Sequence, residues 1–189
     1  TTQAYNVFSL SPALSGYDPP MIPLVETLGI ESPSSGLANT LHVLDSLNRP
    51  ILFSMHASSG SPYVDLKKGT FPWIRAMAQV TNAKAEVEAL PNAVYRPIGV
   101  TVVHGEADND LGNAPLYQSF LEEWQHDYES DISAIMGDTI NFPLFVSQMN
   151  TGWTGEMAVA QYKAHKDNPG KIILVGPKYQ YEYSDQLHL

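Results

Sequence analysis

The fold is decided by residues 99–110, which read GVTVVHGEADND. Pro97 precedes a β-branched run, and a glycine with polar residues follows it. This pattern predicts a buried strand of a parallel sheet that ends in a loop. In open α/β sheets, ligands bind at the carboxyl ends of the strands. We therefore expect one edge of the sheet to carry His104, Gly105, Glu106 and Asp108.

Strand and helix patterns alternate on both sides of this stretch. Apolar runs predict further strands at residues 51–55, 142–149 and 171–175. Apolar residues at helical spacing predict helices at residues 36–48, 73–90, 115–136 and 154–166. Parallel neighbours need long crossover connections, so this alternation predicts an α/β fold with a parallel sheet and helices on both faces.

The first 35 residues have no strong periodicity. Prolines interrupt every candidate element there: Pro12, Pro19, Pro20, Pro23 and Pro33. We expect this segment to run over the surface of the domain without regular structure.

The composition fits one globular domain, residues 1–189. The chain has 43% hydrophobic and 16% charged residues and a formal net charge of −10. An acidic chain is a poor match for nucleic acid or an anionic membrane surface, so neither is expected as a partner. No apolar run approaches the roughly 20 residues that span a bilayer. The absence of cysteine excludes disulfides, thiol nucleophiles and zinc–thiolate sites.

Polar residues that could carry chemistry lie in two clusters. Asp185 and His188 follow the last predicted strand within one turn of each other, so the carboxylate could orient an imidazole that acts as a general base. Gly60 lies in a small-residue loop after a predicted strand, where its backbone N–H could donate to a substrate oxygen. His104 could supply a side-chain donor to the same oxygen, with Glu106 supporting it.

Ordinary structural roles compete with these interpretations. A D-x-x-H pair arises readily in solvated loops, and Gly60 also suits an ordinary turn. Residues 104–106 likewise suit a helix cap or a turn. Residues 108–110 resemble a fragment of a calcium loop, but the glycine and the distal glutamate of that loop are missing. We therefore predict a solvated turn at residues 108–110.

A further set of blocks occurs in a defined order along the chain: residues 31–36, 53–63, 68–73, 103–108 and 185–189. These blocks resemble successive blocks of the SGNH hydrolase superfamily, in particular its sialate O-acetylesterase-like and carbohydrate esterase branch. The resemblance implies a flavodoxin-like three-layer α/β/α fold and a serine esterase that removes acyl groups, usually acetyl, from carbohydrate. In that mechanism His188 is the general base, Asp185 orients it, Gly60 is the backbone oxyanion donor, and no metal or cofactor is needed.

The chain departs from that family's pattern in two places. His104 stands where this branch usually has a glutamine as side-chain oxyanion donor, although a neutral imidazole can still donate one hydrogen bond. The family's nucleophilic serine lies in a Gly-Asp-Ser or Gly-Gln-Ser block near the start of the domain, and this sequence has no such block. We therefore expect the serine and the first strand to lie before Thr1 in a longer parent polypeptide, and the last helix to lie after Leu189.

The flavodoxin-like strand order 2-1-3-4-5 puts this missing strand between the strands predicted near Ile51 and Val100. Neighbouring strands lie about 4.8 Å apart, so two strands cannot pair across a gap one strand wide. We expect that residues 1–189 do not form a stable domain alone, and that the remainder of the parent polypeptide completes the sheet.

Three other interpretations stay open. Ser58 could be the nucleophile of an α/β-hydrolase, although the first glycine of a Gly-x-Ser-x-Gly elbow is missing. The chain could be a non-catalytic carbohydrate-binding component whose 10 tyrosines and 3 tryptophans stack on sugars. A metal-dependent hydrolase would draw its ligands from His56, His104, Glu106, Asp108 and His188.

For an acylated carbohydrate substrate, an extracellular, virion-surface or cell-surface location is favoured.

Overall fold

The computed structural model describes residues 7–10, 21–24, 33–44, 49–149 and 155–176. The chain forms two compact units, the first of residues 1–56 and 78–95 and the second of residues 57–77 and 96–189. Helix α2 (Phe71–Glu88), predicted at residues 73–90, contributes residues to both units. No helix in the described part of the chain is long and apolar enough to cross a membrane.

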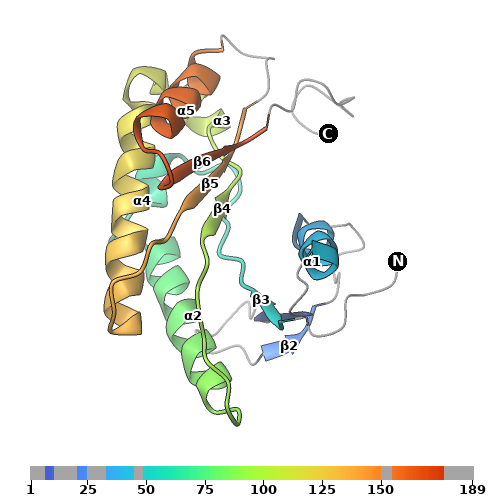
Figure 1. The fold of residues 1–189 in the computed structure, drawn as a ribbon. Coiled ribbons are helices and arrows are strands. Elements are labelled where there is room, and N and C mark those ends of the chain that lie inside the picture. The colour runs from blue at the N-terminus through green and yellow to red at the C-terminus, as the bar shows by residue number, and fades with distance from the viewer. Residues whose placement is uncertain (1–6, 11–20, 25–32, 45–48, 150–154, 177–189) are drawn as a thin grey trace. The chain divides into compact units, whose positions relative to one another are not determined.

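The second unit contains a three-stranded parallel sheet in the order β4-β5-β6. Its strands are β4 (Val100–Val102), β5 (Leu144–Ser147) and β6 (Ile172–Val175). Val100 pairs with Leu144, and Leu144 pairs with Ile172, so the carboxyl ends of the strands lie at one edge of the sheet (Figure 1). The sequence-based strand predictions for this part of the chain are confirmed.

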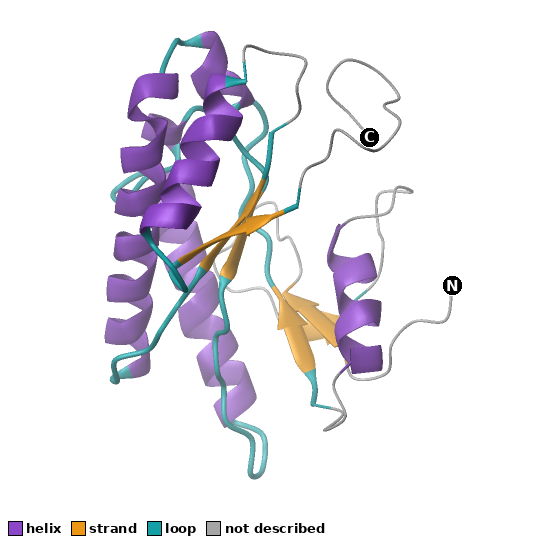
Figure 2. Ribbon diagram, turned by 45° about the horizontal axis from the view of Figure 1, so that its top comes forward, coloured by secondary structure: helices purple, strands orange, loops and turns teal. Residues whose placement is uncertain are grey.

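Helices α4 (Ala114–Met136) and α5 (Glu156–Asp167) pack against each other on one face of this sheet (Figures 1 and 2). Gly137 ends α4 in the left-handed conformation, as its position after the predicted helix implies. Both predicted helices are confirmed with small shifts at their ends. This unit is therefore an α/β structure in which helices flank a parallel sheet. Helix α4 buries an apolar stripe at helical spacing: Leu121, Trp124, Tyr128 and Ile132.

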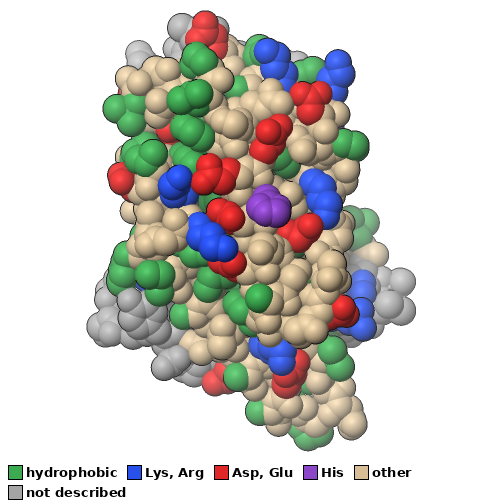
Figure 3. Space-filling model, turned by 90° about the vertical axis from the view of Figure 1, so that its left-hand side faces the viewer, with side chains coloured by type: hydrophobic (Ala, Val, Ile, Leu, Met, Phe, Trp, Pro, Cys, Tyr) green, Lys and Arg blue, Asp and Glu red, His purple; other side chains and the backbone are tan. Residues whose placement is uncertain are grey.

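Acidic and basic side chains lie next to one another on the face that α4 presents, without a patch of one sign (Figure 3). Lys67 pairs with Glu123, and Lys68 pairs with Asp131. Ion pairs as exposed as these contribute on the order of 0 to 1 kcal/mol each. Burial of the apolar stripe, rather than charge pairing, therefore holds α4 in place.

The first unit contains a second three-stranded sheet in the order β2-β1-β3. Its strands are β1 (Val7–Leu10), β2 (Met21–Pro23) and β3 (Ile51–Phe53). Strand β1 is antiparallel to β2 and parallel to β3. Helix α1 (Pro33–Leu44) packs Ala38 against Leu24, with Phe53 beside them. The predicted strand at residues 51–55 and the predicted helix at residues 36–48 are confirmed.

One expectation fails in the first unit. The sequence predicts no regular structure in residues 1–35, whereas β1 and β2 both lie there. The sequence also predicts that the strands near Ile51 and Val100 do not pair with each other, and among the described residues β3 pairs with β1 while β4 pairs with β5. Strands β1 and β2 are too short for a clear periodicity, and β1 pairs with a strand far away in the sequence, so no local pattern reveals them. Among the described residues, β3 and β4 are consequently edge strands of separate sheets.

No residue range is predicted from the sequence for two short helical elements. One is the 3-10 helix η1 (Tyr63–Asp65), and the other is α3 (Glu106–Asp110), which follows β4. The predicted solvated turn at residues 108–110 is therefore wrong: these residues belong to α3, and Asp108 is buried.

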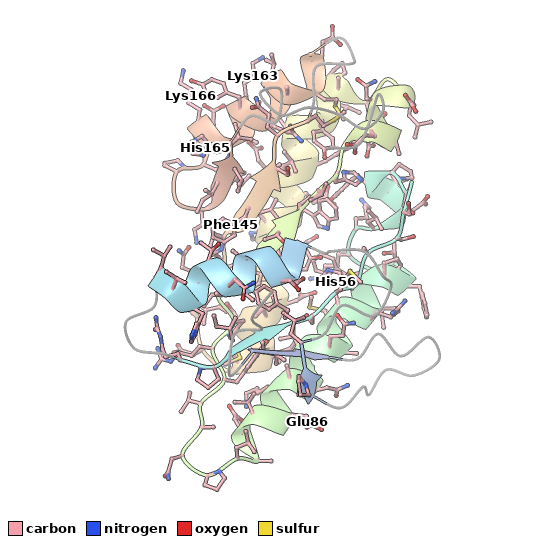
Figure 4. The ribbon with its side chains drawn as sticks, turned by 90° about the vertical axis from the view of Figure 1, so that its right-hand side faces the viewer. His56, Glu86, Phe145, Lys163, His165 and Lys166 are labelled. Carbon is pink, nitrogen blue, oxygen red and sulfur yellow. The ribbon has the colours of Figure 1, made fainter. Side chains whose placement is uncertain are left out.

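Gly99, which precedes β4, generates a prediction about stability. Its φ is +156°, and a Cβ there would lie 2.6 Å from Phe145 Cε2 and 2.9 Å from the backbone oxygen of Pro143. Phe145 is on β5 and is labelled in Figure 4. We predict that Gly99→Ala lowers the free energy of unfolding by about 2 to 3 kcal/mol, because it adds both a steric clash and backbone strain. Urea unfolding of the protein that contains this chain measures the change.

Gly36 on α1 is the matched control. No atom lies within 4 Å of the position that its Cβ would take. Alanine is favoured over glycine by about 1 kcal/mol inside a helix, so Gly36→Ala should leave the free energy of unfolding unchanged or raise it. Equal effects of the two substitutions would contradict the steric argument.

Candidate functional site

The candidate site lies where β4 ends and the chain turns into α3. Gly105 directly precedes α3 and has φ +138°. A Cβ at this position would collide with the Met149 sulfur and would lie 3.4 Å from the Tyr117 hydroxyl. Only glycine fits this turn, because any side chain would meet both a steric clash and an unfavourable backbone conformation. The turn brings His104 and Asp108 together at the carboxyl edge of the sheet.

Both ring nitrogens of His104 have protein partners. Nε2 lies 3.0 Å from the backbone oxygen of Ser61, and Nδ1 lies 2.7 Å from the Tyr117 hydroxyl. Because a carbonyl oxygen can only accept, Nε2–H is the donor, and in the neutral ring Nδ1 accepts from Tyr117. Burial lowers the pKa of His104, although the Asp108 carboxylate, the hydrogen bond to Ser61 and the Glu106 carboxylate act in the opposite direction. His104 is therefore a neutral imidazole that joins the β4–α3 turn to the loop at Ser61.

Asp108 is a buried carboxylate with defined hydrogen-bond partners. Its side chain is 0% exposed. Oδ2 accepts the backbone N–H of Tyr63 at 2.7 Å, and Oδ1 accepts from Asn113 Nδ2 at 2.7 Å. His104 Nε2 lies 3.5 Å from Oδ2. Hydrogen bonds from the protein replace those to the water that a carboxylate loses on burial, and Asp108 can therefore be buried.

These contacts hold the loop of residues 58–63. Its two fixed points are the carbonyl of Ser61 and the N–H of Tyr63, and Pro62 between them restricts the backbone. Gly60 is exposed, has φ +68°, and has no atom within 4 Å of the position that a Cβ would take. Among the hydrogen bonds of the described residues, none uses the Gly60 N–H. The loop therefore presents a free backbone donor close to the carboxyl end of β4.

Gln161 is a site residue that no sequence motif indicates. It lies on α5 and is 0% exposed. Its Oε1 accepts the N–H of Met149 at 2.8 Å, and its Nε2 donates to the carbonyls of His104 and Ser147 at 3.2 and 3.3 Å. Gln161 thus joins the carboxyl ends of β4 and β5. Its signal in the sequence is a polar residue at helical spacing among buried apolar ones: Met157, Ala160 and Ala164.

Glu106 and Ser58 have less specific surroundings. Glu106 is half-buried in the first turn of α3, and no hydrogen bond among the described residues involves its carboxylate. Ser58 is exposed, and its hydroxyl oxygen lies 2.9 Å from that of Ser61. The partner of Ser58 is thus a second hydroxyl rather than the imidazole that would activate a nucleophile.

The predicted pair Asp185 and His188, like Thr1, lies outside the described residues. Within the described part of the chain, no group of three or more histidine, aspartate or glutamate side chains could hold a metal ion. Of the suggested metal ligands, His104 and Asp108 direct their polar atoms to protein partners. His56 belongs to the first unit of the chain (Figure 4).

The lowered pKa of His104 predicts a pH dependence of stability. Below the ordinary pKa of 6.5, the unfolded chain binds a proton that the folded protein takes up only at lower pH. The free energy of unfolding therefore falls as the pH falls through this window. His104→Gln keeps a donor for the Ser61 carbonyl but removes the titrating group. We expect its free energy of unfolding to fall less than that of the unmodified protein between about pH 7 and pH 5, as measured by urea unfolding at each pH.

His126, exposed on α4, provides the control. His126→Gln removes a histidine of the same chemistry that is not buried, so its pH profile should follow that of the unmodified protein. Identical profiles for both variants would exclude the buried imidazole as the source of the pH dependence.

The chain shares its fold with a protein of known structure. A scan against protein-family models finds no match. A search of the curated proteins also finds none. Among solved structures, the X-ray structure of a protein from Arabidopsis thaliana is similar with a TM-score of 0.74 and 16% sequence identity, covering 100% of this chain and 75% of that chain. At this identity the similarity concerns the fold alone, and it extends over the whole of this chain.

Proposed function

We propose that this chain belongs to a serine esterase of the SGNH type that removes acyl groups, O-acetyl in the first place, from carbohydrate or polysaccharide. The proposal includes a flavodoxin-like three-layer α/β/α domain of which residues 1–189 are a part, with the nucleophilic serine contributed from before Thr1. The parallel sheet flanked by helices and the blocks that resemble this family support it. The net charge of −10 favours a neutral substrate over nucleic acid or an anionic membrane. An extracellular, virion-surface or cell-surface location suits such a substrate.

The observation that carries the proposal is the N–H of the exposed residue Gly60, which has no partner among the described hydrogen bonds and lies in the loop that His104 holds at the carboxyl end of β4. When a serine attacks an ester carbonyl, negative charge develops on the carbonyl oxygen, and a preoriented backbone N–H stabilises that charge. The loop around Gly60 is held by the buried side chains of His104 and Asp108. Because the loop is already fixed, the donor needs little reorganisation when the charge develops.

In the proposed reaction, His188 removes the proton of the serine hydroxyl while the serine oxygen attacks the ester carbonyl. Asp185 holds the imidazole in one orientation. Collapse of the tetrahedral intermediate breaks the ester bond, and the released sugar oxygen takes the proton from His188. Water then attacks the acyl-enzyme with the same proton transfers, which releases the carboxylic acid and restores the serine.

His104 has a supporting role in this proposal. Its Nε2–H donates to Ser61 and its Nδ1 accepts from Tyr117, so a hydrogen bond from His104 to substrate would require the loss of one of these bonds. We therefore assign His104 to holding the Gly60 loop. Gly105 permits the turn, and Glu106 is the candidate for a side-chain contact with the substrate.

The edge of the β4-β5-β6 sheet supports the proposed position of the nucleophile. Among the described residues β4 has β5 as its one neighbour, and an edge strand leaves a row of N–H and C=O groups unpaired. A parallel strand from before Thr1 that pairs with β4 would satisfy these groups. A serine at the carboxyl end of that strand would lie at the same edge of the sheet as Gly60.

The alternative functions have less support. A metal-dependent hydrolase needs a cluster of ligands, and the described residues contain none with three or more members. A carbohydrate-binding component needs exposed aromatic rings. Among the described residues, Phe71 and Tyr162 are exposed, whereas Trp73, Trp124 and Tyr128 are buried in the core. Both alternatives are outcomes of the tests below.

The first test is removal of the proposed base in the parent polypeptide. His188→Ala should reduce the kcat for hydrolysis of an acetylated sugar by several orders of magnitude, on the scale seen when a triad member is removed. His126→Ala is the matched control, since it deletes an exposed imidazole on α4. A folded His188→Ala variant with nearly normal kcat would refute the assignment.

The second test separates the serine mechanism from the metal mechanism and from simple binding. Activity should survive prolonged treatment with EDTA and should be lost with a serine-directed fluorophosphonate, because the serine mechanism needs no cation. Mass spectrometry of the labelled protein should locate the adduct on a serine before Thr1. An adduct on Ser58 would favour the α/β-hydrolase alternative. Loss of activity with EDTA and recovery with zinc or manganese would favour the metal hydrolase, and binding of sugar without hydrolysis would favour the non-catalytic component.

A further inference from the structure

Asp108 combines complete burial with a short connection to the Gly60 loop. A carboxylate without water is costly unless its oxygens accept strong hydrogen bonds. The donors are the Tyr63 N–H on Oδ2 and the Asn113 side-chain amide on Oδ1, both at 2.7 Å. Each carboxylate oxygen thus has its own donor, so the carboxylate cannot rotate without losing one of them. The direction of the Tyr63 N–H is consequently defined by a side chain that is itself fixed.

The second contact to this loop comes from the same turn. His104 Nε2–H donates to the Ser61 carbonyl, so the β4–α3 turn holds the loop at two backbone groups on either side of Pro62. Proline restricts φ to about −65°, which leaves little freedom between the two held groups. Gly60 directly precedes this held segment. Movement of Tyr63 away from Asp108 would therefore be passed on to the Gly60 N–H.

We infer that Asp108 is a positioning residue for the oxyanion donor: the two hydrogen bonds that it accepts, from Tyr63 and from Asn113, set the place of the Gly60 N–H relative to the ester carbonyl. The inference rests on the proposed esterase function and extends it to a residue that touches neither substrate nor nucleophile. It differs from a role in stability alone, because a displaced oxyanion donor weakens the transition state more than the bound substrate.

The test first removes both hydrogen bonds in the parent polypeptide. Asp108→Leu keeps roughly the shape of the side chain but has no acceptor, so the Tyr63 N–H and the Asn113 side-chain amide both lose their partner. We expect kcat for hydrolysis of an acetylated sugar to fall roughly 10- to 100-fold while KM changes less than about threefold.

The double variant Asp108→Asn with Asn113→Asp keeps the bond from Tyr63 and restores the bond between positions 108 and 113 with donor and acceptor exchanged. The amide oxygen introduced at position 108 can accept from Tyr63, and the NH₂ group of the same amide can donate to the new carboxylate at position 113. Position 113 is partly exposed, so the charge there is partly solvated. We expect kcat to return to within about threefold of the unmodified enzyme.

Asp110→Asn is the matched control, because Asp110 lies on the same short helix and is exposed. It removes an identical charge without touching the loop, so kcat should not change. If neither the single nor the double variant folds, as judged by thermal unfolding, Asn113→Ala serves instead. It leaves the Tyr63 bond in place and frees the carboxylate to rotate, and kcat should fall several-fold at constant KM.

The outcomes separate the inference from the proposed function. An unmodified parent polypeptide that does not hydrolyse acetyl esters refutes the proposed function itself. If that protein is active and folded Asp108→Leu has normal kcat, or if the double variant folds but stays as slow as Asp108→Leu, the positioning role is wrong while the esterase proposal stands. For Asn113→Ala, a change in KM alone would likewise overturn the positioning role.

Discussion

The hydrogen bonds of the buried Asp108 carboxylate are the interaction on which the candidate site depends. They join α3, the start of α4 and the loop of residues 58–63, three segments that no regular backbone pattern connects. A buried charge is tolerated only where donors surround it, so the site can form only when Tyr63 and Asn113 are in place. The same requirement makes the geometry unique, because any other position of the loop would leave one carboxylate oxygen without a hydrogen-bond donor.

The β4–α3 turn, which presents this carboxylate, depends on how β4 and β5 are held together. Gly105 fits beside the Met149 sulfur only because it has no side chain. Gln161 donates to both strand ends and accepts from Met149, so its amide fixes the separation of the two backbones at the carboxyl edge. The buried apolar stripe of α4 and the packing of α4 on α5 keep Gln161 in position. The core thus supports the site through one polar side chain, which explains why a glutamine is completely buried there.

The sequence was sufficient to predict the α/β alternation and most of the individual elements. A long apolar periodicity, such as that of α4, predicts a helix whatever its tertiary neighbours are, because it reflects burial of one helix face. The short strands β1 and β2 could not be predicted, since three or four residues carry no usable period and the partner of β1, β3, is distant along the chain. The sequence also predicts the polar cluster at residues 104–108 at the carboxyl end of a strand, but it does not predict the burial of Asp108. Asp108, followed by an asparagine and a second aspartate, has the composition of a solvated turn. Only the hydrogen bond from the N–H of Tyr63, which is distant in the sequence, explains why Asp108 is buried.

What the sequence by itself determined is the order of strands and helices in the second unit and the location of its candidate site. Both follow from local hydrophobic periods and from the position of glycines, which act within a few residues. What only the tertiary structure decided is the division of the strands into two sheets, the engagement of both His104 nitrogens, and the inclusion of Gln161 in the site. Each of these depends on hydrogen bonds between groups that are far apart in the sequence. Such bonds form only after the chain has folded, because their donors and acceptors meet no partner in the unfolded chain other than water.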